Sequence, residues 1–353
     1  MDGDNILGGR VRMGLVGLGF GAGLLHRELL PGCKGAEHVE VAAVCDRDEA
    51  KTRRLAEEKG FRPCFDMEAL LSDPAIEAVG LFTPPHGRAE LVRRCIRAGK
   101  HVMTTKPFEM DPVAALDVLR EAERLGMAVH ANSPSPHPNG VVAQALAWHE
   151  RHALGAPVSA RMWAGKSRRR EEADGRWLDD PDLCPVAPVL RIGIYLINDL
   201  ARVFGEPESV NAMETRLFTG RPTADAAQIG ILFKNKALAT IQVTFALADG
   251  HAAPGWIFSF ENGSVFCNVE PRERGQGWGG RPFPLALARH LESGEVVVER
   301  GSAQGAGYQW ENFRRAVRGE KLEGAIKPEE FVRGVRILNA AARSIKSGKT
   351  EQA

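Results

Sequence analysis

The stretch Val11-Arg12-Met13-Gly14-Leu15-Val16-Gly17-Leu18-Gly19-Phe20-Gly21-Ala22 decides the fold of this chain. An apolar, strand-like run leads directly into the pattern Gly-x-Gly-x-x-Ala, which is the spacing of a dinucleotide-binding turn. Gly17 permits a tight turn, Gly19 lets a pyrophosphate approach the backbone, and Ala22 lets the next helix pack closely. We expect that helix over residues 21–30, with its N-terminal amides facing the phosphates. The alternative is an ordinary glycine-rich turn, because a short motif alone is weak evidence for dinucleotide binding.

A second apolar run, residues 39–45, ends at Asp46 and predicts a buried parallel strand. A carboxylate at this place accepts hydrogen bonds from the adenosine ribose and repels a 2′-phosphate, so we expect NAD rather than NADP. Arg47 leaves NADP as an alternative cofactor. Its side chain could stack on the adenine, or pair with a 2′-phosphate if Asp46 turns away. The alternative for Asp46 is a structural one, as the cap of the helix that begins near residue 48.

The length and net charge of the chain limit the number of domains and the kinds of partner that we expect. The chain has 353 residues, enough for two domains, and a formal net charge of +1. That charge gives no case for nucleic acid or membrane binding. The most basic run, Lys166 to Arg170, is followed by Glu171 and Glu172. We expect a solvated loop there, with an acidic or phosphorylated substrate as the alternative.

Cysteine usage and the N-terminus predict a cytoplasmic protein. The N-terminus is acidic, and no stretch approaches the roughly eighteen apolar residues of a membrane span. The six cysteines are scattered without a Cys-x-x-Cys pair, which favours reduced thiols. Histidines and carboxylates show no metal-ligand spacing, so we expect no metal.

Strands and helices alternate through residue 131, which predicts a parallel sheet with helices on both faces. A proline-rich link, residues 132–138, follows, and beyond it come β-like runs joined by short turns, typical of an antiparallel sheet. We therefore expect an α/β protein with a dinucleotide-binding domain, residues 1–131, and a substrate and oligomerisation domain, residues 132–353.

Two further segments carry candidate chemistry. Lys106 precedes Pro107 at the carboxyl end of the predicted strand over residues 101–105, where ligands bind in open α/β sheets. A predicted helix over residues 188–199 places Arg191, Tyr195 and Asn198 on one face by their spacing. Lys106 could instead be a surface lysine, and Tyr195 a core tyrosine bonded to backbone.

Together these pieces resemble the glucose–fructose oxidoreductase / inositol dehydrogenase (Gfo/Idh/MocA) family. The matching segments, in order, are Gly17-Leu18-Gly19-Phe20-Gly21-Ala22, Val44-Cys45-Asp46-Arg47, Thr83-Pro84, Gly99-Lys100-His101-Val102, Lys106-Pro107, and Gly193-Ile194-Tyr195 with Asn198. The resemblance implies a Rossmann domain followed by an α/β domain with a large, mostly antiparallel sheet. That sheet often forms a subunit interface in the family, which implies a homo-dimer or tetramer.

The resemblance also implies site roles. Lys106 matches the lysine that lies near nicotinamide and substrate in the family. Tyr195 stands where many members have histidine and one branch has tyrosine, a proton donor or acceptor for a substrate hydroxyl. Three departures alter the site: Thr105 replaces the usual glutamate, Arg191 replaces an aspartate, and residues 184–188 replace a glycine-rich stretch.

We therefore expect an NAD(P)-dependent oxidoreductase that acts on a secondary alcohol or ketone of a sugar, polyol or related cyclic compound. The expected catalytic residues are Lys106 and Tyr195. The expected cofactor-binding residues are Gly17, Gly19, Phe20, Gly21, Ala22, Asp46, Arg47, Thr83, Pro84, His86 and Lys106, and the expected substrate residues are Arg191, Asn198, His137 and Trp177. The alternatives are a non-catalytic NAD(P)-binding sensor and an oxidoreductase that never releases its cofactor.

Overall fold

The structure is a computed structural model that describes residues 9–167, 175–247, 254–269, 282–305 and 307–353. The chain forms two compact units. The first comprises Met1–Glu109, Val113–Pro136 and Tyr308–Pro328, and the second Met110–Pro112, His137–Gly307 and Glu329–Ala353. The sequence suggested one division at residue 131, whereas here the chain returns to the first unit after residue 307.

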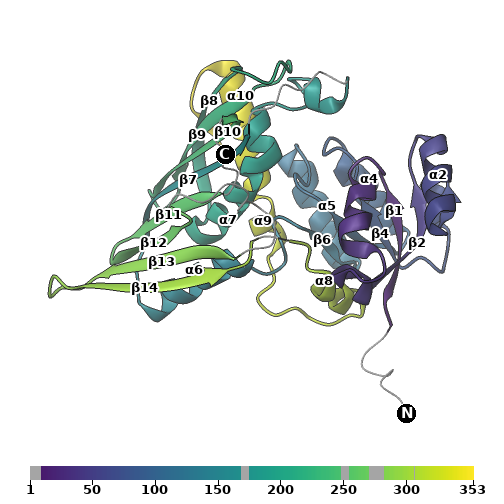
Figure 1. Ribbon diagram of the computed structural model, residues 1–353, viewed down its shortest axis with the longest axis horizontal. Coiled ribbons are helices and arrows are strands. Elements are labelled where there is room, and N and C mark those ends of the chain that lie inside the picture. The colour runs from purple at the N-terminus through teal and green to yellow at the C-terminus, as the bar shows by residue number, and fades with distance from the viewer. Residues whose placement is uncertain (1–8, 168–174, 248–253, 270–281, 306) are drawn as a thin grey trace, which may run out of the picture. The chain divides into compact units, whose positions relative to one another are not determined.

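A six-stranded parallel sheet forms the centre of the first unit (Figure 1). Its strand order is β3 (Arg62–Cys64), β2 (Val39–Cys45), β1 (Val11–Val16), β4 (Ala78–Leu81), β5 (His101–Thr104) and β6 (Val129–Ala131). Among the helices that connect these strands are α2 (Glu49–Lys59), α3 (Glu68–Leu71), α4 (Arg88–Arg97) and α5 (Pro112–Arg124). The order reverses at β1, which makes its carboxyl end the switch point where open α/β sheets bind ligands.

The helix after β1 differs from the expected continuous α-helix over residues 21–30. It begins as α1 (Gly21–Leu24), continues as a π-helical turn, η1 (Leu25–Leu29), and is followed by a 3₁₀ turn, η2 (Lys34–Glu37). Leu24, Leu25 and Leu29 are buried in the core of this unit.

The returning segment packs through α8 (Trp310–Val317). The Trp310 indole donates to Glu28 Oε2 at 2.7 Å, and Trp310 and Phe313 are buried in the first unit's core. Arg318 forms an ion pair with Glu77 at 2.5 Å. These contacts explain why residues 308–328 belong to the first unit despite their place in the sequence.

The second unit is built on nine strands, which lie side by side in one sheet in the following order. They are β14 (Val296–Ala303), β13 (Phe283–His290), β12 (Gly263–Cys267), β11 (Gly255–Phe260), β7 (Pro157–Ser167), β10 (Leu238–Leu247), β9 (Ala226–Phe233), β8 (Pro207–Thr215) and β15 (Glu351–Gln352). β7 and β10 pair in parallel, and the other recorded pairs are antiparallel. The expected mostly antiparallel sheet is confirmed.

Helices cover one face of this sheet (Figure 1). They are α6 (Gly140–Arg151), the π turn η4 (Val189–Gly193) with α7 (Ile194–Phe204), and α10 (Arg333–Ser347), accompanied by the short η3 (Trp177–Asp179) and α9 (Pro328–Phe331). Along β10, residues alternate between buried and exposed, with Ile241 and Val243 toward the helices and Thr240 and Gln242 on the other face. This alternation is typical of an antiparallel sheet with one covered face.

None of the described helices is long and apolar enough to cross a membrane. All six cysteines are free thiols. Within the described ranges, no group of three or more histidine, cysteine or acidic residues could hold a metal ion.

Candidate active site

The glycine turn after β1 has the shape of a phosphate cradle. Gly17 has φ of 91°, and a Cβ at this position would lie 2.8 Å from the carbonyl carbon and oxygen of Phe82. At Gly19, no described atom outside its neighbours lies within 4 Å of the Cβ position, so a ligand can approach the backbone there. A Cβ at Gly21 would meet the Phe82 ring at 3.2 Å, so Gly21 allows the helix's close packing while Ala22 lies at the edge of the core. These features fit a dinucleotide pyrophosphate.

Asp46 joins the glycine turn to the end of β2. Its Oδ2 accepts from the Leu18 amide at 2.6 Å, and its Oδ1 accepts from the Asp48 amide at 3.1 Å. The helix cap is Asp48, which accepts from the Lys51 amide at 3.0 Å, so Asp46 does not cap α2. Each Asp46 oxygen keeps acceptor capacity for a ribose hydroxyl, since an ionised carboxylate offers about four lone-pair sites. Arg47 is exposed beside it.

The loop after β4 contains a polar atom that suits a ligand. Thr83 Oγ1 is buried and has no hydrogen-bond partner in the described part of the chain. A buried hydroxyl without a partner is costly, so such groups in native proteins often meet a ligand or water. Pro84 is exposed and His86 half-buried in the same loop, and Phe20, 46% exposed, lies across from Phe82.

Lys106 follows β5, on the strand that neighbours β4 in the sheet. Its backbone amide donates to Asn132 Oδ1 at 3.1 Å, and the Thr105 hydroxyl contacts the same oxygen at 3.4 Å. The side chain is half-buried. Because the carboxyl ends of β1, β4 and β5 share one sheet edge, the structure places Lys106 on the edge that carries the glycine cradle.

A residue that the sequence analysis missed, Arg88, holds the Lys106 turn in place. It begins α4 and is 1% exposed. Its Nη1 donates to the carbonyls of Thr105 (2.6 Å) and Phe108 (3.2 Å) and contacts that of Pro107, and its Nη2 contacts the Thr83 carbonyl. Burial lowers the pKa of Arg88 to about 10, while the neighbouring charge of Glu109 opposes that shift. The guanidinium therefore stays charged at neutral pH and ties the Thr83 loop to the Lys106 turn.

Replacing Arg88 by methionine should destabilise the first unit by about 3–5 kcal/mol, because it removes a buried charge that Glu109 balances and the donor to several buried carbonyls. Urea unfolding measures the effect. Arg94→Met is the matched control, since Arg94 lies on the same helix in an exposed ion pair with Glu68 and should cost at most about 1 kcal/mol. An equal loss of unfolding free energy in the two variants would contradict the role of Arg88 in holding the Lys106 turn.

In the second unit, Arg191 lies in η4 and Tyr195 and Asn198 in α7. Arg191 and Tyr195 are half-buried and share one side of the helix at a spacing of four residues. Asn198 is 6% exposed, and its Oδ1 lies so close to Gly334 of α10 that a side chain there would overlap it. This contact gives Asn198 a helix-packing role, and its part in substrate binding stays a prediction.

Asp199 is a titratable group next to this face. Its carboxylate accepts from Asn139 Nδ2 at 3.1 Å, and Asn139 Oδ1 caps α6 by accepting from Val141 and Val142. Burial raises the pKa of Asp199 to about 7, although Arg202 and the Asn139 hydrogen bond oppose the rise. The folded protein therefore binds a proton at this carboxyl more tightly than the unfolded chain does.

Stability should consequently fall as pH rises from about 4 to about 7, where the folded state holds more protons than the unfolded state. Asp199→Asn removes this dependence, so its Tm should exceed that of the wild type by at least about 2 °C near pH 8 and by less near pH 5. Asp182→Asn, in an exposed pair with Lys346, is the control and should show no such trend. A Tm difference independent of pH would refute the titration of Asp199.

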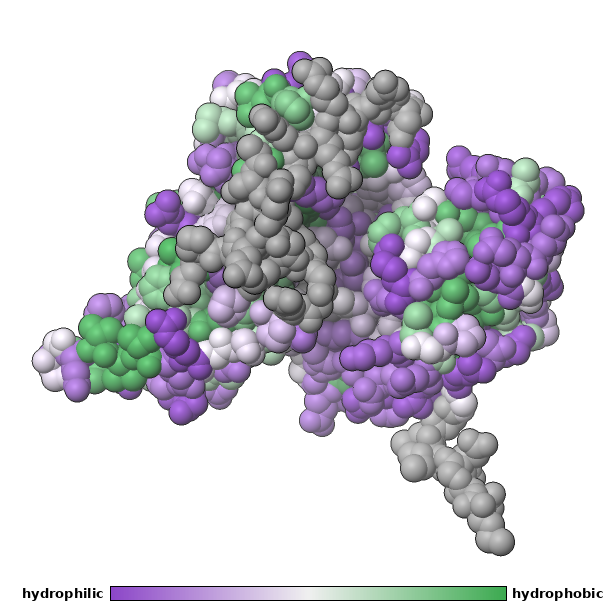
Figure 2. Space-filling view, in the orientation of Figure 1, coloured by the Kyte–Doolittle hydropathy of each residue, from purple (hydrophilic) through white to green (hydrophobic). Residues whose placement is uncertain are grey.

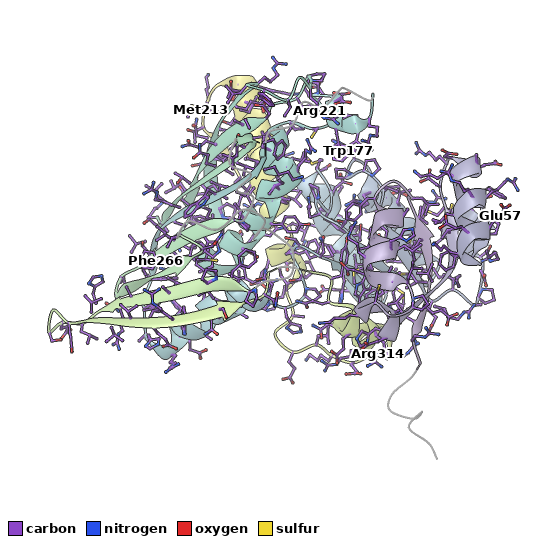
Figure 3. The ribbon with its side chains drawn as sticks, viewed as in Figure 1. Glu57, Trp177, Met213, Arg221, Phe266 and Arg314 are labelled. Carbon is purple, nitrogen blue, oxygen red and sulfur yellow. The ribbon has the colours of Figure 1, made fainter. Side chains whose placement is uncertain are left out.

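The other two expected substrate residues lie in connecting segments of the second unit. Trp177 is partly buried in η3 and packs against the core. Arg221 pairs with Asp179 in the same turn, so Trp177 and Arg221 lie close together (Figure 3). His137 is half-buried in the proline-rich link. The expected roles of Trp177 and His137 in substrate binding stay predictions.

Comparison with known proteins identifies the family. A family sequence model described as an oxidoreductase family with an NAD-binding Rossmann fold, GFO_IDH_MocA, matches residues 11–133. The GFO/IDH/MocA C-terminal domain matches residues 142–266. The chain belongs to this oxidoreductase family, and the expected NAD-binding Rossmann domain is confirmed.

Curated relatives share part of the chain. It is 30% identical over 196 residues to D-xylose 1-dehydrogenase (NADP(+)) 2 of Haloferax volcanii, a match that covers 55% of this chain and 58% of the relative. It is 30% identical over 204 residues to dTDP-3,4-didehydro-2,6-dideoxy-alpha-D-glucose 3-reductase of Streptomyces violaceoruber, covering 55% and 57%. The chain thus spans little more than half the length of these relatives.

Solved structures match the whole fold. Levoglucosan dehydrogenase in complex with NADH and L-sorbose superimposes with a TM-score of 0.73 at 17% identity, covering 98% of this chain and 99% of that one. An oxidoreductase from Agrobacterium radiobacter, in complex with NAD+, L-tartaric acid and magnesium, gives a TM-score of 0.67 at 19% identity, covering 97% and 98%. At these identities the likeness shows the fold.

Proposed function

We propose that this protein transfers a hydride between a nicotinamide cofactor and a secondary alcohol or ketone of a sugar, polyol or related cyclic compound. The observation that carries the proposal is the sheet edge of the first unit. There the glycine cradle after β1 and Lys106 after β5 flank the loop with the unpartnered Thr83 hydroxyl. Relatives named as sugar dehydrogenases and sugar reductases support the substrate class.

Each residue has a separate part in this proposal. The cradle of Gly17 and Gly19 binds the pyrophosphate, Asp46 accepts from the adenosine ribose, and Thr83 donates to the bound cofactor. When bound, the nicotinamide supplies the hydride chemistry. Lys106 and Tyr195 orient the substrate hydroxyl and carry its proton, as general acid–base groups do.

Turnover tests the proposal directly. NADH or NADPH formation is followed on a panel of sugars, polyols and diols, and in the reverse direction on the corresponding ketones. At least one compound should react with the wild type. Tight cofactor binding with no reaction in either direction would favour a non-catalytic sensor and would count against the enzyme.

Cofactor choice follows from Asp46. Calorimetric titration should show tighter binding of NAD than of NADP, because the carboxylate repels a 2′-phosphate. Asp46→Ala should weaken NAD by about 10-fold, the loss of a hydrogen bond to a charged group, and should relieve the exclusion of NADP. The variant also loses the Leu18 contact, so Asp46→Asn serves as the control that keeps an acceptor for that amide. If the wild type prefers NADP, the attraction of Arg47 for the 2′-phosphate outweighs the repulsion by Asp46.

The expected homo-dimer or tetramer also stays a proposal. The second unit exposes apolar residues on the β13–β14 hairpin, where Val296 is 51% and Val298 55% exposed, and Figure 2 shows hydrophobic residues gathered there. Association of two such surfaces would bury these valines.

A further inference from the structure

Arg27 brings a positive charge to the glycine turn of the first unit. It belongs to η1, and its guanidinium carbon lies 5.7 Å from the centre of the Phe20 ring, within the roughly 6 Å range of a cation–π contact. Phe20 comes directly after Gly19, at the start of α1. The Arg27 side chain therefore runs back along the helix toward the turn, as long helical side chains do.

A second glycine makes room for the guanidinium. A Cβ at Gly23 would lie 3.0 Å from Arg27 Nη1, so this nitrogen lies against the backbone of α1 where there is no side chain. Gly23 is four residues after Gly19, which is about one helical turn or 5.4 Å along the axis. Arg27 is exposed, so a change of rotamer can carry its charge over that distance.

The charge of Arg27 is not neutralised by an ion pair with any acidic side chain in the described ranges. Glu28 acts on it through space, but Glu28 is half-buried and accepts from the Trp310 indole at 2.7 Å. Burial also raises the pKa of Glu28. The N–H groups of Arg27 thus remain available to an anion at the turn.

The pyrophosphate of a dinucleotide is an anion that fits this place. Residues 11–133 match the NAD-binding Rossmann model, and no described atom outside its neighbours lies within 4 Å of the Cβ position of Gly19. A planar guanidinium matches paired phosphate oxygens. The Asp46 carboxylate, bonded to the Leu18 amide, adds a negative charge at the turn, and a cation beside the turn offsets its repulsion of the phosphates.

We propose that Arg27 pairs with the pyrophosphate of the bound cofactor and that Phe20 holds the guanidinium beside the turn for this contact. The inference rests on the part of the proposed function that places the pyrophosphate at Gly17 and Gly19, and it does not depend on turnover. Residues 168–170 of the basic run in the second unit lie outside the described residues and take no part in the argument.

Calorimetry with NADH, ADP-ribose and adenosine tests the proposal. Arg27→Gln should weaken NADH and ADP-ribose, which contain the pyrophosphate, by about 10-fold, the loss of a hydrogen bond to a charged group. Adenosine, measured by competition with ADP-ribose, has no phosphate and should bind as it binds the wild type. Arg27→Lys keeps the charge without the planar fork, so its NADH affinity should fall between the two. Added salt should weaken NADH less in Arg27→Gln than in the wild type, because one screened ion pair is gone.

Arg12→Gln is the matched control. It removes the same charge from an exposed arginine near the amino end of β1, where Arg12 pairs with Glu40, and should leave NADH affinity within about 2-fold. Phe20→Leu tests the part given to the ring. It should weaken NADH by less than Arg27→Gln, and the double variant should bind no more weakly than Arg27→Gln alone, because both changes remove one contact. Additive losses would overturn the part given to Phe20.

Four results would overturn the proposal: unchanged NADH affinity in Arg27→Gln, an equal loss for adenosine, an equal loss in Arg12→Gln, or no binding of NADH to the wild type at up to about 10 mM, which corresponds to negligible affinity. Failure of the proposed function looks different. If the glycine turn did not hold the pyrophosphate, Gly19→Val would keep the wild-type affinity for NADH. If the protein bound NADH without transferring a hydride, the affinity losses in Arg27→Gln would remain.

Discussion

Lys106→Ala is expected to reduce kcat by about a hundred- to ten-thousand-fold, the range for loss of a positioned proton-transfer group. NAD affinity should stay within a few-fold of the wild type, because the pyrophosphate and ribose contacts lie at the glycine cradle and Asp46. Steady-state kinetics and calorimetry on the same preparations measure the two effects. Lys321→Ala, an exposed lysine of the first unit, is the control and should change neither. If kcat falls only as far as NAD affinity does, Lys106 is a cofactor-binding residue without a role in proton transfer.

Tyr195→Phe is the second large expected loss. The change removes one hydroxyl and keeps the ring, so Tm should hold while kcat falls by about a hundred- to ten-thousand-fold. The only other tyrosine, Tyr308, stacks on Trp310 in the first unit, and Tyr308→Phe should leave kcat within a few-fold. The loss in the double variant with Lys106→Ala should be far from additive if both residues serve one proton transfer. A wild-type kcat for Tyr195→Phe would make this tyrosine structural, and His137 the next candidate.

The first sheet was predictable because its signals are local. β1 is an apolar run that ends at Gly17, and both its bounds and the turn after it follow from neighbouring residues. The same holds for Lys106, whose place at the end of β5 depends only on the strand and on Pro107. Short-range signals therefore sufficed for the family and for the parallel sheet, while the cofactor-binding roles of the residues at its edge stay predictions.

The missed features depend on contacts between distant segments. The sequence analysis did not single out β13, which contains Pro284, yet the strand pairs on both sides, and the Pro284 carbonyl accepts from the Asn268 amide at 2.9 Å. Nothing near Arg88 in the sequence shows that it is buried beneath four carbonyls. The contact of Asn198 with Gly334 joins segments far apart in the chain. Spacing alone placed Asn198 with Tyr195, and only tertiary packing shows that it meets α10.

Transfer of deuterium from labelled NADH measures most directly whether this protein moves a hydride between nicotinamide and a small molecule. The protein is incubated with NADH deuterated at C4 and a mixture of small metabolites, and mass spectrometry searches for compounds that gain carbon-bound deuterium. The wild type should label at least one compound, and Lys106→Ala and Tyr195→Phe should label it far more slowly. Absence of labelling by a wild-type protein that binds NADH, or equal labelling by Lys106→Ala, would contradict hydride transfer at this site.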